Sequence, residues 1–272
     1  MFGRDRIEYK SPDQMRIMRR AGLVVADLLD AVREQIRPGV TTAELDAVAT
    51  RVIADAGATS NFLNYHGFPA RVCISVNSEV VHGIPGERVI EPGDVVSVDG
   101  GAIVDGWHGD SAFSVVVPDA DPADLDLVRV TEEAMWAGIA ALATADRLGQ
   151  VGEAIDDAVT AAGGLGIVAE YVGHGIGSAM HQPPDVLNYR SGHRGPRVRA
   201  GMCLAIEPML VRGEPTTAVL ADDWTVVTVD GSRAAHFEHS VAVHADGIWV
   251  LTARDGGAES LARHGVRAVP IG

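Results

Sequence analysis

The chain has 272 residues and a mass of 28.5 kDa, and 47% of its residues are hydrophobic, which suits one large globular domain or two small ones. Its formal net charge of -15, from 22 Lys+Arg against 37 Asp+Glu, repels phosphate backbones and anionic membrane surfaces. We therefore expect no direct nucleic-acid partner and no membrane contact, whereas a peptide or a small substrate stays open.

The cysteine content indicates a reducing compartment. Only Cys73 and Cys203 are present, too few for a disulfide scaffold. Residues 1–10 are not followed by an apolar h-region, so they do not read as a signal peptide. No segment reaches the ~18 uninterrupted apolar residues of a membrane span. These features predict a cytoplasmic protein, which we expect to be a monomer.

Helix signals open the chain. Ser11-Pro12-Asp13-Gln14 has the form of a capping box with proline at the first helical position, and predicts a helix that ends at Pro38-Gly39. Thr41-Thr42-Ala43-Glu44 predicts a second helix, which Gly57 ends. Between Arg71 and Val117, short β-branched runs separated by turns predict strands.

The same order then repeats. After a loop at 118–122, helices are predicted at about 122–146 and 150–162, followed by strands to about Leu251. Two apolar segments, 93–99 and 201–207, each run from a turn glycine to a carboxylate. This duplication predicts two similar halves related by a pseudo-twofold axis in one domain. We expect that domain over 11–251, between an N-terminal segment at 1–10 and a loosely held C-terminal tail at 252–272.

The hairpin signal at Asp105-Gly106 brings two carboxylates together. Asp-Gly supplies the positive φ angles of a type I′ turn, and counting back from it pairs Gly101 with Asp110. Asp99 then lies on the same face as Asp110 and diagonal to it. Two buried carboxylates repel each other, so one is protonated or a cation lies between them. We expect Gly100 and Gly101 to leave room beside them.

Three further segments carry isolated polar residues. His174 lies among the glycines of 173–177, Glu207 ends an apolar strand, and Glu238 lies inside another. Taken singly, a lone histidine is more often structural, and either glutamate could be a salt-bridge partner. Taken with Asp99 and Asp110, in a chain without a cysteine cluster, they predict a metal centre with oxygen and nitrogen ligands.

At this point a family resemblance is apparent: the chain resembles the type I methionine aminopeptidases, the short bacterial form of the pita-bread metallopeptidases. The resemblance runs from about Ser11 to Leu251. It implies an α+β pita-bread fold, a pseudo-twofold duplicated antiparallel β-sheet with helices on its outer face. Six segments carry it: Tyr65-His66-Gly67-Phe68-Pro69, Val81-His82-Gly83-Ile84-Pro85, Asp105-Gly106-Trp107-His108-Gly109-Asp110, Gly173-His174-Gly175-Ile176-Gly177, Ala205-Ile206-Glu207-Pro208-Met209 and Phe237-Glu238-His239.

The resemblance implies two divalent metal ions, with Asp110 and Glu238 bridging them. Four carboxylates offset the charge of two such ions, and cobalt, manganese, iron and zinc all suit the donors. A metal-bound water is the implied nucleophile, with Glu207 as its proton acceptor. The implied metal ligands are Asp99, Asp110, His174, Glu207 and Glu238.

The resemblance also implies the substrate contacts. His181 would stabilise the tetrahedral intermediate, and His82 would position the substrate beside the attacked amide. A thioether side chain suits a pocket of aromatic edges and sulfur. The positions that match the family's methionine pocket are Tyr65, Phe68, Cys73 and Trp224, with Met180 and Phe62 beside them. Phe62 and Asn64 depart from the pattern expected before Tyr-His-Gly, which leaves that part of the wall open.

The implied function is metal-dependent removal of the initiator methionine from nascent polypeptides with a small second residue, with the nascent N-terminus and the ribosome as partners. One alternative is an Xaa-Pro aminopeptidase-like hydrolase; those relatives usually carry a large N-terminal domain, and little chain precedes Ser11. Another is a non-catalytic peptide-binding relative, in which substituted ligands are expected. The type II enzymes carry a long insertion where only 25 residues separate His181 from Glu207, which favours type I.

Overall fold

The computed structural model describes residues 6–272, so residues 1–5 of the predicted N-terminal segment lie outside the described residues. None of the helices in this range is both long and apolar enough to span a lipid bilayer. The longer helices are α1 (Pro12–Arg33), α2 (Thr42–Asp55), α3 (Pro122–Leu142) and α4 (Gly149–Ala161), and the short ones are η1 (Tyr65–Gly67) and α5 (Ala258–Arg263). The strands are β1 (Thr59–Ser60), β2 (Val72–Val76), β3 (Glu79–Val81), β4 (Val95–Val104), β5 (Trp107–Val116), β6 (Gly166–Ile167), β7 (Gly173–Gly175), β8 (Gln182–Val186), β9 (Cys203–Ile206), β10 (Met209–Val211), β11 (Thr217–Val219), β12 (Val226–Thr228), β13 (Ala234–His236), β14 (Glu238–His244) and β15 (Gly247–Val250).

The first two helices begin at the predicted capping boxes. At α1 the Gln14 amide N–H donates to the Ser11 hydroxyl, and the Ser11 amide N–H donates to the Gln14 side chain. Thr41 and Glu44 repeat this exchange at α2. The predicted end of α1 was too late, because residues 34–36 already leave the helix in tight turns ahead of Pro38, which disfavours helical conformation in the residue before it.

The main sheet contains nine strands within the described range, and its central path runs β1-β4-β5-β14-β9-β7-β8 with antiparallel pairing. The predicted register of the long hairpin is confirmed: Val104 pairs with Trp107, and Gly101 pairs with Asp110. Asp105 and Gly106 have φ angles of 50° and 79°, as a type I′ turn requires. Strands β13-β10-β6 and β11-β12-β3 form two smaller sheets.

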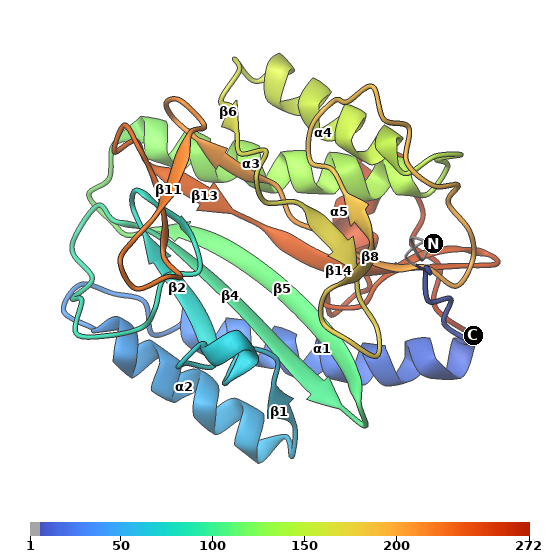
Figure 1. The fold of residues 1–272 in the computed structure, drawn as a ribbon, viewed down its shortest axis with the longest axis horizontal. Helices are drawn as coiled ribbons and strands as arrows, with labels where there is room; N and C mark the ends of the chain where they lie inside the picture. Colours follow the sequence, from blue (N-terminus) through green and yellow to red (C-terminus); the bar gives the residue numbers. More distant parts are fainter. Residues whose placement is uncertain (1–5) are drawn as a thin grey trace, which may run out of the picture.

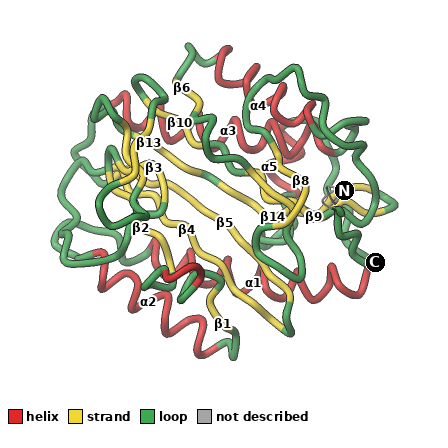
Figure 2. Tube along the Cα trace, in the orientation of Figure 1, coloured by secondary structure: helices red, strands yellow, loops and turns green. Residues whose placement is uncertain are grey.

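The helices cover the sheet in two pairs. In Figure 1, α1 and α2 lie along one margin and α3 and α4 along the opposite one, with β4, β5 and β14 running between them. Figure 2 shows the same strand layer between two helical margins. The largest apolar core lies between these layers and includes Leu28 of α1, Val98 of β4, Leu127 of α3 and Leu204 of β9, all fully buried. This arrangement agrees with the predicted duplication and α+β class.

The tail after Leu251 is packed, so the expectation that it is loosely held is wrong. Leu261 of α5 is fully buried, and the Val269 amide N–H donates to the Ile248 carbonyl at 3.0 Å. Gly256 and Gly257, at φ 69° and 83°, form the turn that leads into α5. The division of the chain at residues 11 and 251 stays a prediction.

Candidate metal centre and substrate pocket

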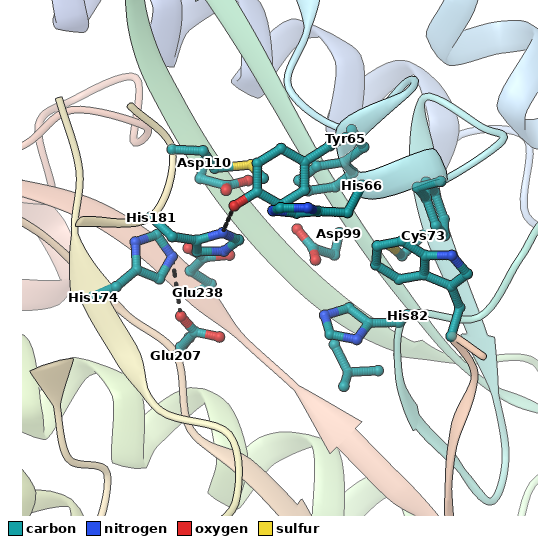
Figure 3. Close-up of a pocket in the computed structure, with 15 residues that line it drawn as sticks. Tyr65, His66, Cys73, His82, Asp99, Asp110, His174, His181, Glu207 and Glu238 are labelled. Carbon is teal, nitrogen blue, oxygen red and sulfur yellow. Dashed lines mark hydrogen bonds and ion pairs between the residues drawn. The ribbon is translucent and has the colours of Figure 1, made fainter. Parts of the chain in front are cut away.

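One cavity of about 170 Å³ gathers every site residue that the sequence singled out. Figure 3 shows its labelled carboxylates and imidazoles pointing toward one another from separate strands and loops. Two residues of its lining, His66 and Val81, were not predicted as site residues. The predicted residues that line it are Phe62, Tyr65, Phe68, Cys73, His82, Asp99, Asp110, His174, Met180, His181, Glu207, Trp224 and Glu238.

The four carboxylates come from the centre of the main sheet. Asp99 and Asp110 lie on the paired strands β4 and β5, Glu238 opens β14 beside Ala112 of β5, and Glu207 follows β9. Asp110 is 3% exposed and Glu238 2% exposed. One ligand atom each from Asp110, His174 and Glu238 lies within 4.8 Å of the others, a spacing that a single cation could bridge.

Burial and mutual repulsion oppose ionisation of this group. Burial is the main cause that raises the pKa of Asp110 to about 7, against hydrogen bonds from Asn61 and Ser111. Burial, and then the charges of the neighbouring carboxylates, raise the pKa values of Asp99, Glu207 and Glu238. Asp99 Oδ1, Asp110 Oδ1 and Glu238 Oε1 are buried without hydrogen-bond partners. Hard divalent cations would supply the missing positive charge and contacts, so this donor set fits them.

His174 is held in the neutral form that a metal ligand needs. Its Nδ1 donates to the Gly175 carbonyl at 3.0 Å, which leaves the lone pair on Nε2, 3.3 Å from Glu207 Oε1. Burial is the main cause that lowers the pKa of His174 to about 3. The flanking glycines are needed for close strand packing: a Cβ at Gly173 would lie 2.3 Å from the Ala205 carbonyl oxygen.

The expectation that Gly100 and Gly101 leave room beside the carboxylates is wrong, because side chains fill both spaces. A Cβ on Gly101 would lie 2.1 Å from Asn61 Nδ2, and one on Gly100 would lie 2.8 Å from Leu28. Asn61 Nδ2 donates to the Gly109 carbonyl, and its Oδ1 lies 3.0 Å from His108 Nδ1. Asn61 was missed, and the glycine opposite Asp110 was its only signal in the sequence.

Two further histidines, His82 and His181, line the cavity that holds the carboxylates and His174. His82 has a φ of 61° and meets the Trp224 ring edge-on at 5.9 Å. Burial is the main cause that lowers its pKa to about 4, so it is neutral at pH 7. His181 lies in the loop between β7 and β8, where its Nδ1 is 2.8 Å from the Tyr65 hydroxyl. This contact leaves Nε2 of His181 free to face a bound molecule.

An apolar pocket adjoins the carboxylates. Phe62, Phe68, Cys73 and Met180 form one buried cluster, against which Trp224 packs. The Phe68 ring meets Trp224 edge-on at 5.0 Å and Phe62 at 6.4 Å. Phe62, whose place in the wall was open, is 7% exposed and belongs to this cluster.

Glu207 has two partners that were also missed. His236 Nε2 lies 3.8 Å from Glu207 Oε2 and is buried with no hydrogen bond, and Asn188 Nδ2 donates to the Glu207 carbonyl at 3.1 Å. His236 had a signal in the sequence, because it stands two residues before Glu238 in an extended segment, where alternate side chains share a face. Asn188 had none.

Comparison with known proteins places this geometry in a family context. The pattern of metallopeptidase family M24 matches residues 16–245. Methionine aminopeptidase 1 of Mycobacterium tuberculosis is 48% identical over 256 residues, which cover 92% of this chain and 96% of that protein. The crystal structure of methionine aminopeptidase from Thermotoga maritima superposes with a TM-score of 0.89 at 39% identity, covering 92% of this chain and all of that one. Prolidase from Pyrococcus furiosus shares the fold, with a TM-score of 0.70 and 19% identity. The match covers 90% of this chain and 65% of the prolidase chain.

Proposed function

The chain belongs to metallopeptidase family M24 and, within it, to the type I methionine aminopeptidases with the pita-bread fold, and from this premise we propose how its cavity works. It is a metal-dependent aminopeptidase that removes an N-terminal methionine. The observation that carries the proposal is that three buried carboxylates, the half-buried Asp99 and a neutral imidazole share one cavity with a sulfur- and aromatic-lined pocket.

Two divalent ions are proposed as the cofactors. Their four positive charges would offset the four carboxylates and remove the repulsion that raises the carboxyl pKa values. When bound, such ions polarise a carbonyl and activate water for hydrolysis at neutral pH. The residues proposed to hold them are Asp99, Asp110, His174, Glu207 and Glu238.

The apolar cluster is proposed to bind the methionine side chain. A thioether gains about 0.3–1.5 kcal/mol from each favourable contact with an aromatic edge, and Phe68, Tyr65 and Trp224 supply such edges. Met180 and Cys73 add polarisable sulfur, and burial raises the pKa of Cys73, so that thiol stays protonated. This pocket orients the first peptide bond of the substrate toward the carboxylates.

Three residues are proposed to act on the peptide bond. Glu207, whose side chain lines the cavity, accepts the proton of the attacking water. His181 donates from Nε2 to the carbonyl oxygen as negative charge develops there. His82 holds the substrate backbone against the Trp224 side of the cavity.

The proposed physiological substrate is the N-terminus of a nascent polypeptide with a small second residue, and the ribosome is a proposed partner. We also propose that the enzyme acts in the cytoplasm as a monomer. Cys73 and Cys203 are both buried free thiols, as a reducing compartment allows.

Hydrolysis of two peptides by the metal-loaded protein tests this function. We expect release of methionine from Met-Ala-Ser, no cleavage of an Ala-Pro peptide, and two metal ions per chain by elemental analysis. Cleavage of the Ala-Pro peptide alone would favour an Xaa-Pro hydrolase. Cleavage of neither peptide with manganese, iron, cobalt or zinc would favour a peptide-binding protein.

A further inference from the structure

The segment before α1 packs against the strands and loops beside the cavity. We call residues 7–10 the N-terminal strap. The Lys10 amide N–H donates to the Gly201 carbonyl at 2.7 Å. Tyr9 lies against Gly201, because a Cβ added at Gly201 would lie 3.0 Å from the Cβ of Tyr9. The Lys10 side chain is 1% exposed. Because Ser11 caps α1 immediately afterwards, the strap is anchored at its C-terminal end.

Glu8 joins this strap to the loop between β7 and β8. Its Oε1 accepts a hydrogen bond from the Ser178 hydroxyl at 2.6 Å. Its Oε2 accepts from the Ser178 amide N–H at 3.1 Å and from Gln182 Nε2 at 2.9 Å. Lys10 Nζ lies 3.4 Å from the same oxygen. Partial burial opposes ionisation, but these hydrogen bonds and the Lys10 charge lower the pKa of Glu8 to about 2.

The two residues that Glu8 holds bracket part of the substrate pocket. Between Ser178 and Gln182 stand Met180, buried at 2% exposure in the apolar cluster, and His181, which contacts Tyr65. Ser178 and Ala179 are exposed, and the other contacts of this stretch lie at its two ends, where the His108 N–H donates to the Gly177 carbonyl and Gln182 pairs with Gly175, and at His181. Glu8 also fits closely: a Cβ on Gly177 would lie 2.2 Å from Glu8 Oε2.

We propose that Glu8 is a positioning residue, which holds the Ser178–Gln182 loop so that His181 and Met180 meet the substrate. The proposal rests on the roles given above to His181 and Met180. A carboxylate suits this task because every group it contacts in the loop is a donor. A glutamine there could still accept from the Ser178 N–H and Gln182 and donate to the Ser178 hydroxyl oxygen, but it would lose the charge that faces Lys10, whereas an alanine would remove every acceptor.

The test compares Glu8→Ala and Glu8→Gln with the parent on Met-Ala-Ser and on the same peptide with norleucine in place of methionine. Glu44→Gln is the matched control, because Glu44 also accepts from a backbone N–H and a hydroxyl, those of Thr41, but lies on α2 away from the cavity. We expect kcat/KM of Glu8→Ala on Met-Ala-Ser to fall roughly 10- to 100-fold, as misplacement by about 1 Å does. Glu8→Gln can keep the hydrogen bonds to the loop, so its loss should be smaller. We also expect a smaller ratio of kcat/KM on the methionine peptide to kcat/KM on the norleucine peptide.

Two further readouts separate positioning from general destabilisation. Metal content should equal that of the parent, and amide hydrogen exchange should accelerate in peptides covering 176–186 but not in those covering 42–55. Destabilisation alone would lower the active fraction without changing the methionine preference. If Glu8→Ala does not fold, Ser178→Ala, which removes only the hydroxyl hydrogen bond, should show a smaller loss of the same kind.

A folded Glu8→Ala variant with kcat/KM within twofold of the parent, an unchanged methionine preference and unchanged exchange at 176–186 would overturn the inference. If the parent itself does not cleave Met-Ala-Ser, the proposed function fails instead. The hydrogen-exchange comparison still decides whether Glu8 holds the loop in that case.

Discussion

The hydroxyl of Tyr65 lies 2.8 Å from Nδ1 of His181 and links the η1 turn to the loop between β7 and β8. Burial raises the pKa of Tyr65, so the hydroxyl keeps its proton at neutral pH. Burial also lowers the pKa of His181, so its imidazole is neutral. When the hydroxyl donates to Nδ1, the ring proton is on Nε2, the nitrogen proposed to donate to the substrate carbonyl.

Tyr65→Phe tests this choice of tautomer, since it keeps the ring and removes the hydrogen bond. We expect kcat on Met-Ala-Ser to fall about 10-fold with little change in KM, less than the ~10²–10³ lost when an oxyanion donor is removed outright. Steady-state kinetics measure both constants. An unchanged kcat would show that the hydroxyl does not set the His181 tautomer, and His181→Ala supplies the lower limit of activity.

Asp99→Asn should have opposite effects on activity and on the stability of the metal-free protein. It replaces a proposed anionic ligand with a neutral amide, so we expect activity to be lost and metal content to fall. It also removes a charge that the other buried carboxylates repel, so the melting temperature of the metal-free protein should rise. Differential scanning calorimetry after chelation, beside metal analysis before it, measures both effects.

The stabilisation by Asp99→Asn should depend on pH in a defined direction. The pKa of Asp99 is raised in the folded protein, so Asp99 destabilises the folded state only when the unfolded chain ionises. This destabilisation is absent below the ordinary carboxyl pKa near 3.8 and grows as pH rises above it. The gain in melting temperature should therefore be larger at pH 8 than at pH 5. The buried histidines titrate alike in both proteins and cancel in the difference. A gain that is larger at pH 5 would contradict the assignment of repulsion.

Local signals in the sequence predicted the parts of the fold that depend on neighbouring residues. The Asp105-Gly106 turn fixes the β4–β5 register within a few residues, so Asp99 and Asp110 could be brought together by counting. Capping boxes located the starts of α1 and α2 for the same reason. The roles of the ligands and of the pocket came from family resemblance, because no spacing rule joins Asp110 to Glu238 across the sheet.

Contacts between side chains distant in sequence were not predictable in this way. Glu8 meets Ser178 across 170 positions, and nothing near either residue signals the pairing. Asn61 fills the space beside Gly101 of β4, which we expected to stay open next to the carboxylates. The tail after Leu251 is rich in glycine and alanine, yet it docks through α5, which packs against α3 and whose Leu261 is fully buried.

Phe68→Ala and Trp224→Ala should affect the methionine pocket differently. Phe68 is 2% exposed, so truncation leaves a cavity and should lower the free energy of unfolding by about 3–5 kcal/mol. Trp224 is half-buried at the pocket wall, so its loss should raise KM for Met-Ala-Ser with a much smaller change in stability. Chemical denaturation and steady-state kinetics on both variants check this. Equal losses of stability would place Trp224 in the core instead.

Gly101→Ala should weaken metal binding through Asn61, although neither residue is a proposed ligand. The added Cβ would overlap Asn61 Nδ2 at 2.1 Å and displace an amide that holds His108 and the Gly109 carbonyl beside Asp110. Loss of such outer contacts typically lowers metal affinity 10- to 100-fold, so we expect about 10-fold by calorimetric titration of the chelated protein.

The double variant Asn61→Gly with Gly101→Ala separates the steric clash from the lost hydrogen bonds. Glycine at position 61 removes the amide and also the Cβ, which would otherwise lie 2.8 Å from the new methyl carbon, so the double variant should recover part of the stability that Gly101→Ala alone loses. Its metal affinity should stay low, because the amide that supports Asp110 is still missing. If affinity recovers together with stability, the glycine at position 101 serves packing alone, and the hydrogen bonds of Asn61 do not tune the metal centre.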